Sequence, residues 1–162
     1  MTTIEYGHAL HESRHIVACW LVGGVVESAA VGTHASAEGI VKMAPIDNGA
    51  ADLLTRLVGW CQDPDLPESA IWPPPYPPPT KHDPDGVGWC VQYYGLSREN
   101  YEAVVGITLK LPDDPDFRHA TEIVARGLSV APLLTAEALE VLRAETAFAD
   151  EPAEEEIAMV RT

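Results

Sequence analysis

The start of the chain alternates apolar and polar residues with the spacing of an α-helix. Within residues 3–22, Leu10, Val17 and Leu21 form one apolar stripe. A second stripe, at spacings of three and four, consists of Ile4, His8, His11, His15 and Cys19. A threonine before the pattern and two glycines after it supply a cap and a stop. The pattern predicts a helix over residues 3–22 that is buried on most sides.

Two short runs rich in β-branched residues follow this helix. They cover residues 25–33 and 39–44, and the residues between them suit a turn, so we expect a β-hairpin. Apolar periodicity and capping residues predict further helices over residues 49–62, from Ser97 to about Lys110, from Asp114 onwards with Pro115 in the first position, and from Thr135 to about Phe148. The fold class predicted from the pattern is mainly α with a small β-hairpin.

Proline interrupts the pattern at residues 63–85, which hold most of the fourteen prolines of the chain. The run Pro73–Pro79 favours extended polyproline II and excludes a helix or a central strand. We predict a single domain over residues 1–149, with this segment as an insertion and an acidic tail at residues 150–162. Two interpretations of the run stay open: a stiff surface loop, or a docking segment for a partner protein that binds proline-rich motifs.

The net charge of the chain indicates which partners it can bind, and its cysteines bear on the redox state of its compartment. The 162 residues carry a formal net charge of −15, which disfavours contact with nucleic acids and anionic membranes. This charge serves solubility or attracts basic peptide segments. No apolar run approaches the ~20 residues of a membrane span, and no signal-peptide pattern opens the chain, so we expect a cytoplasmic protein. We expect Cys19, Cys61 and Cys90 to be reduced, with a bridge between the last two as the alternative.

Candidate chemistry is concentrated at residues 11–15, which read His-Glu-Ser-Arg-His. Residues four apart share one face of a helix, so His11 and His15 can bind the same zinc ion. Glu12 can then reach the open position on the metal and remove a proton from bound water. This spacing predicts two zinc ligands and a catalytic base. The alternative is a His-Glu pair in an ordinary helix that binds no metal.

A catalytic zinc site takes a third protein ligand. His8 and Cys19 lie on the same stripe as the pair but one turn further out, and a rigid helix cannot bring three successive turns to one ion. We expect both in the core or behind the ligands. Other elements offer His34, His82, His119 and many acidic residues, and the pattern does not choose among them.

Residues 9–17 resemble the zinc-binding helix of the FtsH-type peptidase domain, which typically reads A-Y-H-E-A-G-H-A-L-V. A hairpin and a further helix follow in that family, as they are predicted to do here. Residues 116–126 resemble the family segment N-D-L-x-x-A-T-x-x-A-R, whose aspartate is the third zinc ligand. The resemblance therefore implies Asp116 as the third ligand, in a zincin-like helical peptidase domain. His119, three residues later, and His8 are candidates for orienting a ligand or the oxyanion from behind.

The chain also departs from this family. Arg14 replaces the glycine before the second histidine, and residues 84–110 look inserted. No G-x-x-x-x-G-K-[ST] loop occurs, so we expect no ATP-driven unfolding by this chain.

The combined features predict an ATP-independent zinc metalloendopeptidase that acts on unfolded proteins or short peptides. Two other classes of function remain as alternatives. The chain is a metal-binding scaffold or regulatory module without proteolytic activity, or it is an interaction protein that works through Pro73–Pro79.

Overall fold

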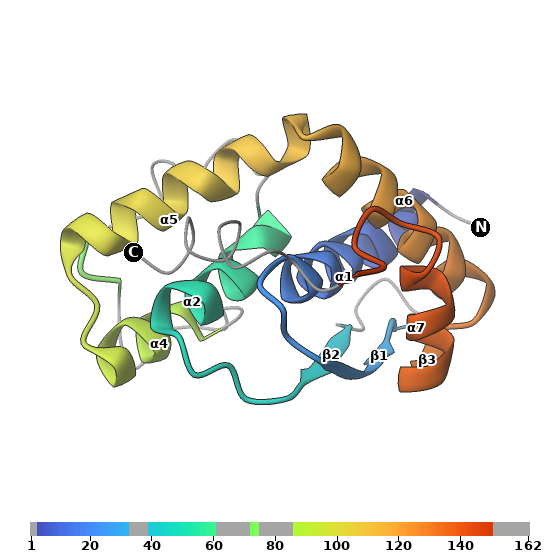
Figure 1. Cartoon of the computed structure of the whole chain (residues 1–162), viewed down its shortest axis with the longest axis horizontal. Coiled ribbons are helices and arrows are strands. Elements are labelled where there is room, and N and C mark those ends of the chain that lie inside the picture. The colour runs from blue at the N-terminus through green and yellow to red at the C-terminus, as the bar shows by residue number, and fades with distance from the viewer. Residues whose placement is uncertain (1–2, 33–38, 61–71, 75–85, 151–162) are drawn as a thin grey trace.

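The computed structural model describes residues 3–32, 39–60, 72–74 and 86–150, and it is mainly helical with one small sheet (Figure 1). Its elements in chain order are α1 (Thr3–Leu21), β1 (Val26–Ala30), β2 (Ile40–Met43), α2 (Gly49–Leu57), the 3-10 turn η1 (Val58–Trp60), α4 (Val87–Tyr94), α5 (Arg98–Lys110), the 3-10 turn η2 (Leu111–Asp113), α6 (Pro115–Val130), β3 (Leu133–Thr135) and α7 (Ala136–Arg143). The prediction of a mainly α protein is confirmed. Most of the proline-rich segment, the turn of the hairpin and the acidic tail after Asp150 lie outside the described residues.

Local sequence signals set most helix boundaries. Helix α1 ends where Gly23 takes a φ of 74°, a left-handed conformation that side chains disfavour. Each predicted N-cap at Ser97, Asp114 and Thr135 accepts a hydrogen bond from a backbone N–H three residues further on. The helix starts at α5, α6 and α7 are therefore the ones that the sequence predicts.

Two helices end earlier than their apolar periodicity predicts. Helix α2 ends at Leu57, and the chain tightens into η1. Helix α7 ends at Arg143 because the Thr146 hydroxyl donates a 2.7 Å bond to the Arg143 carbonyl. The Arg143 guanidinium in turn donates a 2.7 Å bond to the carbonyl of Phe148. Side-chain bonds of this kind compete with helix propagation.

The sheet has three antiparallel strands in the order β2-β1-β3. The predicted pairing of β1 with β2 is confirmed, with Ala29 opposite Val41. Strand β3 was not predicted, because its three residues are too few to show a strand pattern. Among the described strands, β2 pairs on one side only, so it forms an edge of the sheet.

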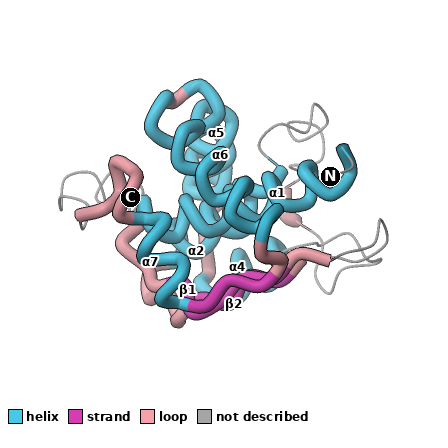
Figure 2. The backbone as a smooth tube through the Cα atoms, turned by 90° about the vertical axis from the view of Figure 1, so that its right-hand side faces the viewer, coloured by secondary structure: helices cyan, strands magenta, loops and turns pink. Residues whose placement is uncertain are grey.

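Two apolar clusters make up the core, and α1 contributes to both. The first joins α1 to α6, α7 and the sheet, and includes Val17, Trp20 and Leu128. The second joins Leu21, the last residue of α1, and Val22 after it to α2, α4 and α5. Figure 2 shows the strands gathered at one side, with the helices stacked beside them. Helix α1 is thus packed between two groups of elements.

No described helix is both long enough and apolar enough to cross a membrane.

Candidate active site

The side chains of His11 and His15 converge on one face of α1. Their ring centroids are 4.9 Å apart with the planes at 75°, and their Nε2 atoms are separated by 3.2 Å. Two nitrogens that share a tetrahedral zinc ion at ~2.0–2.1 Å lie roughly 3.4 Å apart. The spacing of the two imidazoles therefore fits a shared zinc ion.

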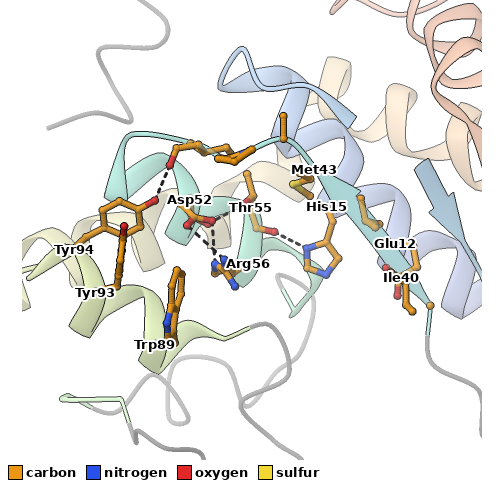
Figure 3. A pocket seen from close by; sticks show the side chains of 15 residues that line it. Glu12, His15, Ile40, Met43, Asp52, Thr55, Arg56, Trp89, Tyr93 and Tyr94 are labelled. Carbon is orange, nitrogen blue, oxygen red and sulfur yellow. Dashed lines mark hydrogen bonds and ion pairs between the residues drawn. The ribbon is translucent and has the colours of Figure 1, made fainter. Parts of the chain in front are cut away.

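The backbone of α2 orients the ring of His15. Its Nδ1 atom lies 2.5 Å from the carbonyl oxygen of Thr55 (Figure 3). A carbonyl only accepts, so Nδ1 carries the proton and Nε2 presents its lone pair toward His11. Burial lowers the pKa of His15 from 6.5 to about 4; nearby Arg14 and Arg56 add to this effect, and the bond to Thr55 opposes it. At neutral pH the His15 ring is therefore uncharged, as a metal ligand must be.

A glycine in η1 keeps the space beside this pair open. A Cβ atom at position 59 would lie 2.5 Å from Nε2 of His15 and 2.8 Å from Nε2 of His11. Gly59 is held in place from α1, because the Arg14 guanidinium donates a 3.2 Å bond to its carbonyl. The added Cβ atom would also lie 2.5 Å from Cε1 of His11, so any side chain at position 59 would crowd both imidazole rings. Arg14, which departs from the FtsH-type pattern, thus packs against the segment that covers the pair.

Glu12 lies next to the histidine pair and beneath the start of β2. Its side chain is buried, and a Cβ atom at Gly39 would collide with the Glu12 carboxyl group. Glu12 and His15 both line a cavity of about 620 Å³. The candidate base and one candidate ligand therefore face the same open space.

Three structural walls enclose this cavity. Strand β2 and the residues after it, up to Ile46, form an apolar wall. Helix α2 contributes polar groups, including the Asp52–Arg56 ion pair with an Nε–Oδ1 distance of 3.0 Å. Helix α4 contributes Trp89 and two tyrosines at the end away from Glu12 (Figure 3). The cavity is thus a trough with the His-Glu chemistry at one end and aromatic rings at the other.

The implied third ligand does not join the pair in this arrangement. Asp116 is exposed in the first turn of α6, although α6 packs along α1. Within the described parts of the chain, no three His, Cys, Asp or Glu side chains come together in a group that could hold a metal. His119 is also exposed on α6, and His8 is half-buried on α1. His34 and His82 lie outside the described residues, so the third donor is unassigned.

The two described cysteines are poor candidates for metal binding or nucleophilic chemistry. Cys19 and Cys90 are free thiols in the core, and burial raises the pKa of each to about 12. A protonated, buried thiol is a weak ligand and a weak nucleophile. Cys19 therefore belongs to the core, as its place on the helix predicts, and Cys61 lies outside the described residues.

Sequence reasoning missed several parts of the site. The bond from His15 to the Thr55 carbonyl involves a backbone atom, which no residue type in the sequence marks. Gly59 looks in the sequence like an ordinary helix terminator. Helix α4 lies within residues 84–110, which look inserted in the sequence, so the sequence does not predict that Trp89 lines the site. The sequence signal nearest to it is the repeated Gly-Trp-Cys tripeptide, whose two copies end at Cys61 and Cys90.

No protein-family model, curated protein or solved structure matches the chain. The FtsH-type resemblance is therefore a hypothesis carried by two sequence segments alone.

Proposed function

We propose that this protein is a zinc-dependent peptidase in which His11 and His15 hold the metal and Glu12 is the catalytic base. The observation that carries the proposal is the 3.2 Å separation of the two Nε2 atoms, with the proton of His15 fixed on the opposite nitrogen by Thr55. When bound, zinc supplies a Lewis acid that makes water more acidic and polarises a carbonyl group.

The burial and surroundings of Glu12 support its assignment as the base. It is buried beside the pair and lines the cavity that a substrate would enter. We assign it the removal of the proton from the attacking water and the delivery of that proton to the leaving amine. Burial in the cavity wall shields this transfer from bulk solvent.

The shape of the cavity favours a peptide as the substrate. Strand β2 lines the cavity, and among the described strands it pairs only with β1, which leaves its other edge unpaired. Such an edge offers backbone N–H and C=O groups that an extended peptide can pair with. A folded domain presents few extended segments, so unfolded proteins and short peptides are the proposed substrates.

Asp116 remains the proposed third ligand, on the strength of the second FtsH-like segment alone. Its carboxylate lies at the start of the helix that packs most extensively on α1. An exposed side chain at this position can change rotamer without disturbing the core.

The decisive test is the Glu12→Gln variant assayed on unstructured peptides. Removal of a general base lowers the rate by roughly 10²–10⁴-fold. We expect cleavage to fall within that range while zinc content, measured by elemental analysis, stays at the wild-type level. The exposed Glu145→Gln variant is the matched control and should cleave normally. Equal cleavage by the wild type and the Glu12→Gln variant would remove Glu12 as the base.

A metal-binding module without proteolytic activity is the second candidate. It is favoured by one observation: Arg14, which stands where the resembled family has a glycine, bonds the Gly59 carbonyl beside the pair. Stoichiometric zinc in the wild type, with no cleavage across a broad peptide set, would establish this function instead.

A further inference from the structure

Three aromatic side chains form a continuous ladder along α4. Trp89 and Tyr93, four residues apart, stack with centroids 4.8 Å apart and planes at 14°. Tyr93 and Tyr94 meet edge to face with centroids 4.9 Å apart. We call Trp89, Tyr93 and Tyr94 the aromatic ladder. All three line the cavity that also contains Glu12 and His15.

Neighbouring elements fix both ends of the aromatic ladder. The Tyr94 hydroxyl donates a 2.6 Å bond to the carbonyl of Ile46, in the cavity wall that follows β2 (Figure 3). At the other end, the guanidinium carbon of Arg56 lies 5.1 Å from the Trp89 ring centroid. Asp52 holds that guanidinium from one turn earlier in α2. The rings are therefore ordered before any ligand arrives, which lowers the entropy cost of binding.

The chemistry around the aromatic ladder selects the kind of side chain that fits. Tyr93 is 68% exposed and Trp89 is 37% exposed, so both offer aromatic surface to a ligand. The opposite wall, between Met43 and Ile46, is apolar. A basic side chain of the ligand would be repelled by the Arg56 guanidinium. An acidic side chain would compete with the Asp52 carboxylate for that guanidinium. An aromatic side chain meets neither penalty and gains ring-on-ring contact.

We propose that the aromatic ladder is a specificity subsite that binds one aromatic side chain of the peptide substrate. This assignment rests on the proposed peptidase function, and it names the substrate class: peptides with an aromatic residue at a fixed distance from the cleaved bond. Trp89 and Tyr93 are the specificity-determining residues, because they contact the bound ring.

Binding to the Glu12→Gln protein tests the subsite without depending on catalysis. The probes are fluorescently labelled unstructured peptides with one Phe moved stepwise through an Ala-Ser background, and the readout is fluorescence anisotropy. We expect Phe at one position to bind about tenfold more tightly than Ala at that position. The Tyr93→Ala variant should reduce this preference to less than twofold and leave the affinity for the all-Ala-Ser peptide unchanged.

Two further variants separate contact from folding. Trp89→Phe keeps a ring for stacking and should retain most of the preference, and Val141→Ala removes an exposed side chain on α7 and should change nothing. Thermal unfolding of each variant checks that the fold is intact. The proposal is overturned if no position prefers Phe, if no peptide binds, or if the preference survives Tyr93→Ala.

The same peptides distinguish this failure from failure of the proposed function. If the wild type cleaves peptides without a preference for Phe, the subsite proposal is wrong and the peptidase proposal is unaffected. If Phe-dependent binding is lost in Tyr93→Ala but the wild type cleaves no peptide, the subsite proposal is supported and the peptidase proposal is wrong.

Discussion

The middle of α1 and the first turn of α6 carry the proposed zinc ligands, and these two regions are built very differently. His15 in α1 is buried, hydrogen-bonded to Thr55 and covered by Gly59. Asp116 in α6 is exposed to solvent. One half is formed by packing in the absence of metal, whereas the other half would have to be recruited by the metal.

This difference shows what each kind of sequence signal can specify. The spacing of four residues places His11 and His15 on one face in any straight helix, so local geometry alone brings them together. Asp116 depends on how α6 is placed along α1, which is a tertiary property. A motif within one helix is therefore a stronger structural prediction than a ligand from a distant element.

The largest expected effect is on the pH dependence of stability, and it comes from His15 in the buried region. The unfolded chain protonates His15 below pH 6.5, whereas the folded chain does so only below about pH 4. The contribution of this group to stability is therefore complete above pH 6.5 and is lost as the pH falls toward 4. One pKa unit corresponds to about 1.4 kcal/mol, so the loss is roughly 3 kcal/mol across this window.

Urea unfolding at several pH values, with a chelator present, measures this loss. The His15→Gln variant is the reference, because every carboxylate is common to both proteins and cancels in the difference. Parallel pH profiles for the wild type and the variant would show that His15 is not buried in its neutral form.

The Gly59→Ala variant tests whether the α1 half needs the open space beside the pair. The added Cβ would lie 2.5 Å from Nε2 of His15, so the rings or η1 must move. We expect zinc affinity, measured by calorimetric titration, to fall about 100-fold. Gly106→Ala is the control, because nothing lies within 4 Å of its added Cβ. That variant should bind zinc normally and gain up to about 1 kcal/mol of stability from helix propensity. Unchanged affinity in Gly59→Ala would place the metal elsewhere.

Asp114 and Asp116, at the start of α6, give the smallest expected effects on stability and the sharpest comparison. Asp116→Ala should lower zinc affinity by more than about 100-fold, because loss of a direct ligand exceeds the effect of losing an outer partner. It should leave the stability of the protein unchanged, because this exposed side chain packs against no core residue. Asp114→Ala should lower stability and leave zinc affinity unchanged, because the Asp114 Oδ1 atom caps α6 by accepting a 2.8 Å bond from the Phe117 amide. Loss of that cap costs about 1 kcal/mol. Wild-type zinc affinity in Asp116→Ala would exclude it as a ligand and direct the search to residues outside the described ranges.

The sequence predicts the fold better than it predicts the site. Helix α1, the β1–β2 pairing and the capped starts of α5, α6 and α7 follow from local rules that need no knowledge of packing. Strand β3 exists only because β1 lies beside it, so no local signal marks it. The same limit applies to the site, where helical spacing pairs two histidines but cannot reveal that a backbone carbonyl at Thr55 orients one of them.

Because the middle of α1 lies in the first apolar cluster, the candidate site is built on part of the main core. Amide protons in the middle of α1 should exchange with solvent only when this cluster opens. Fraying of the first turn of α1, or of the residues after α7, would therefore leave the two imidazoles in place.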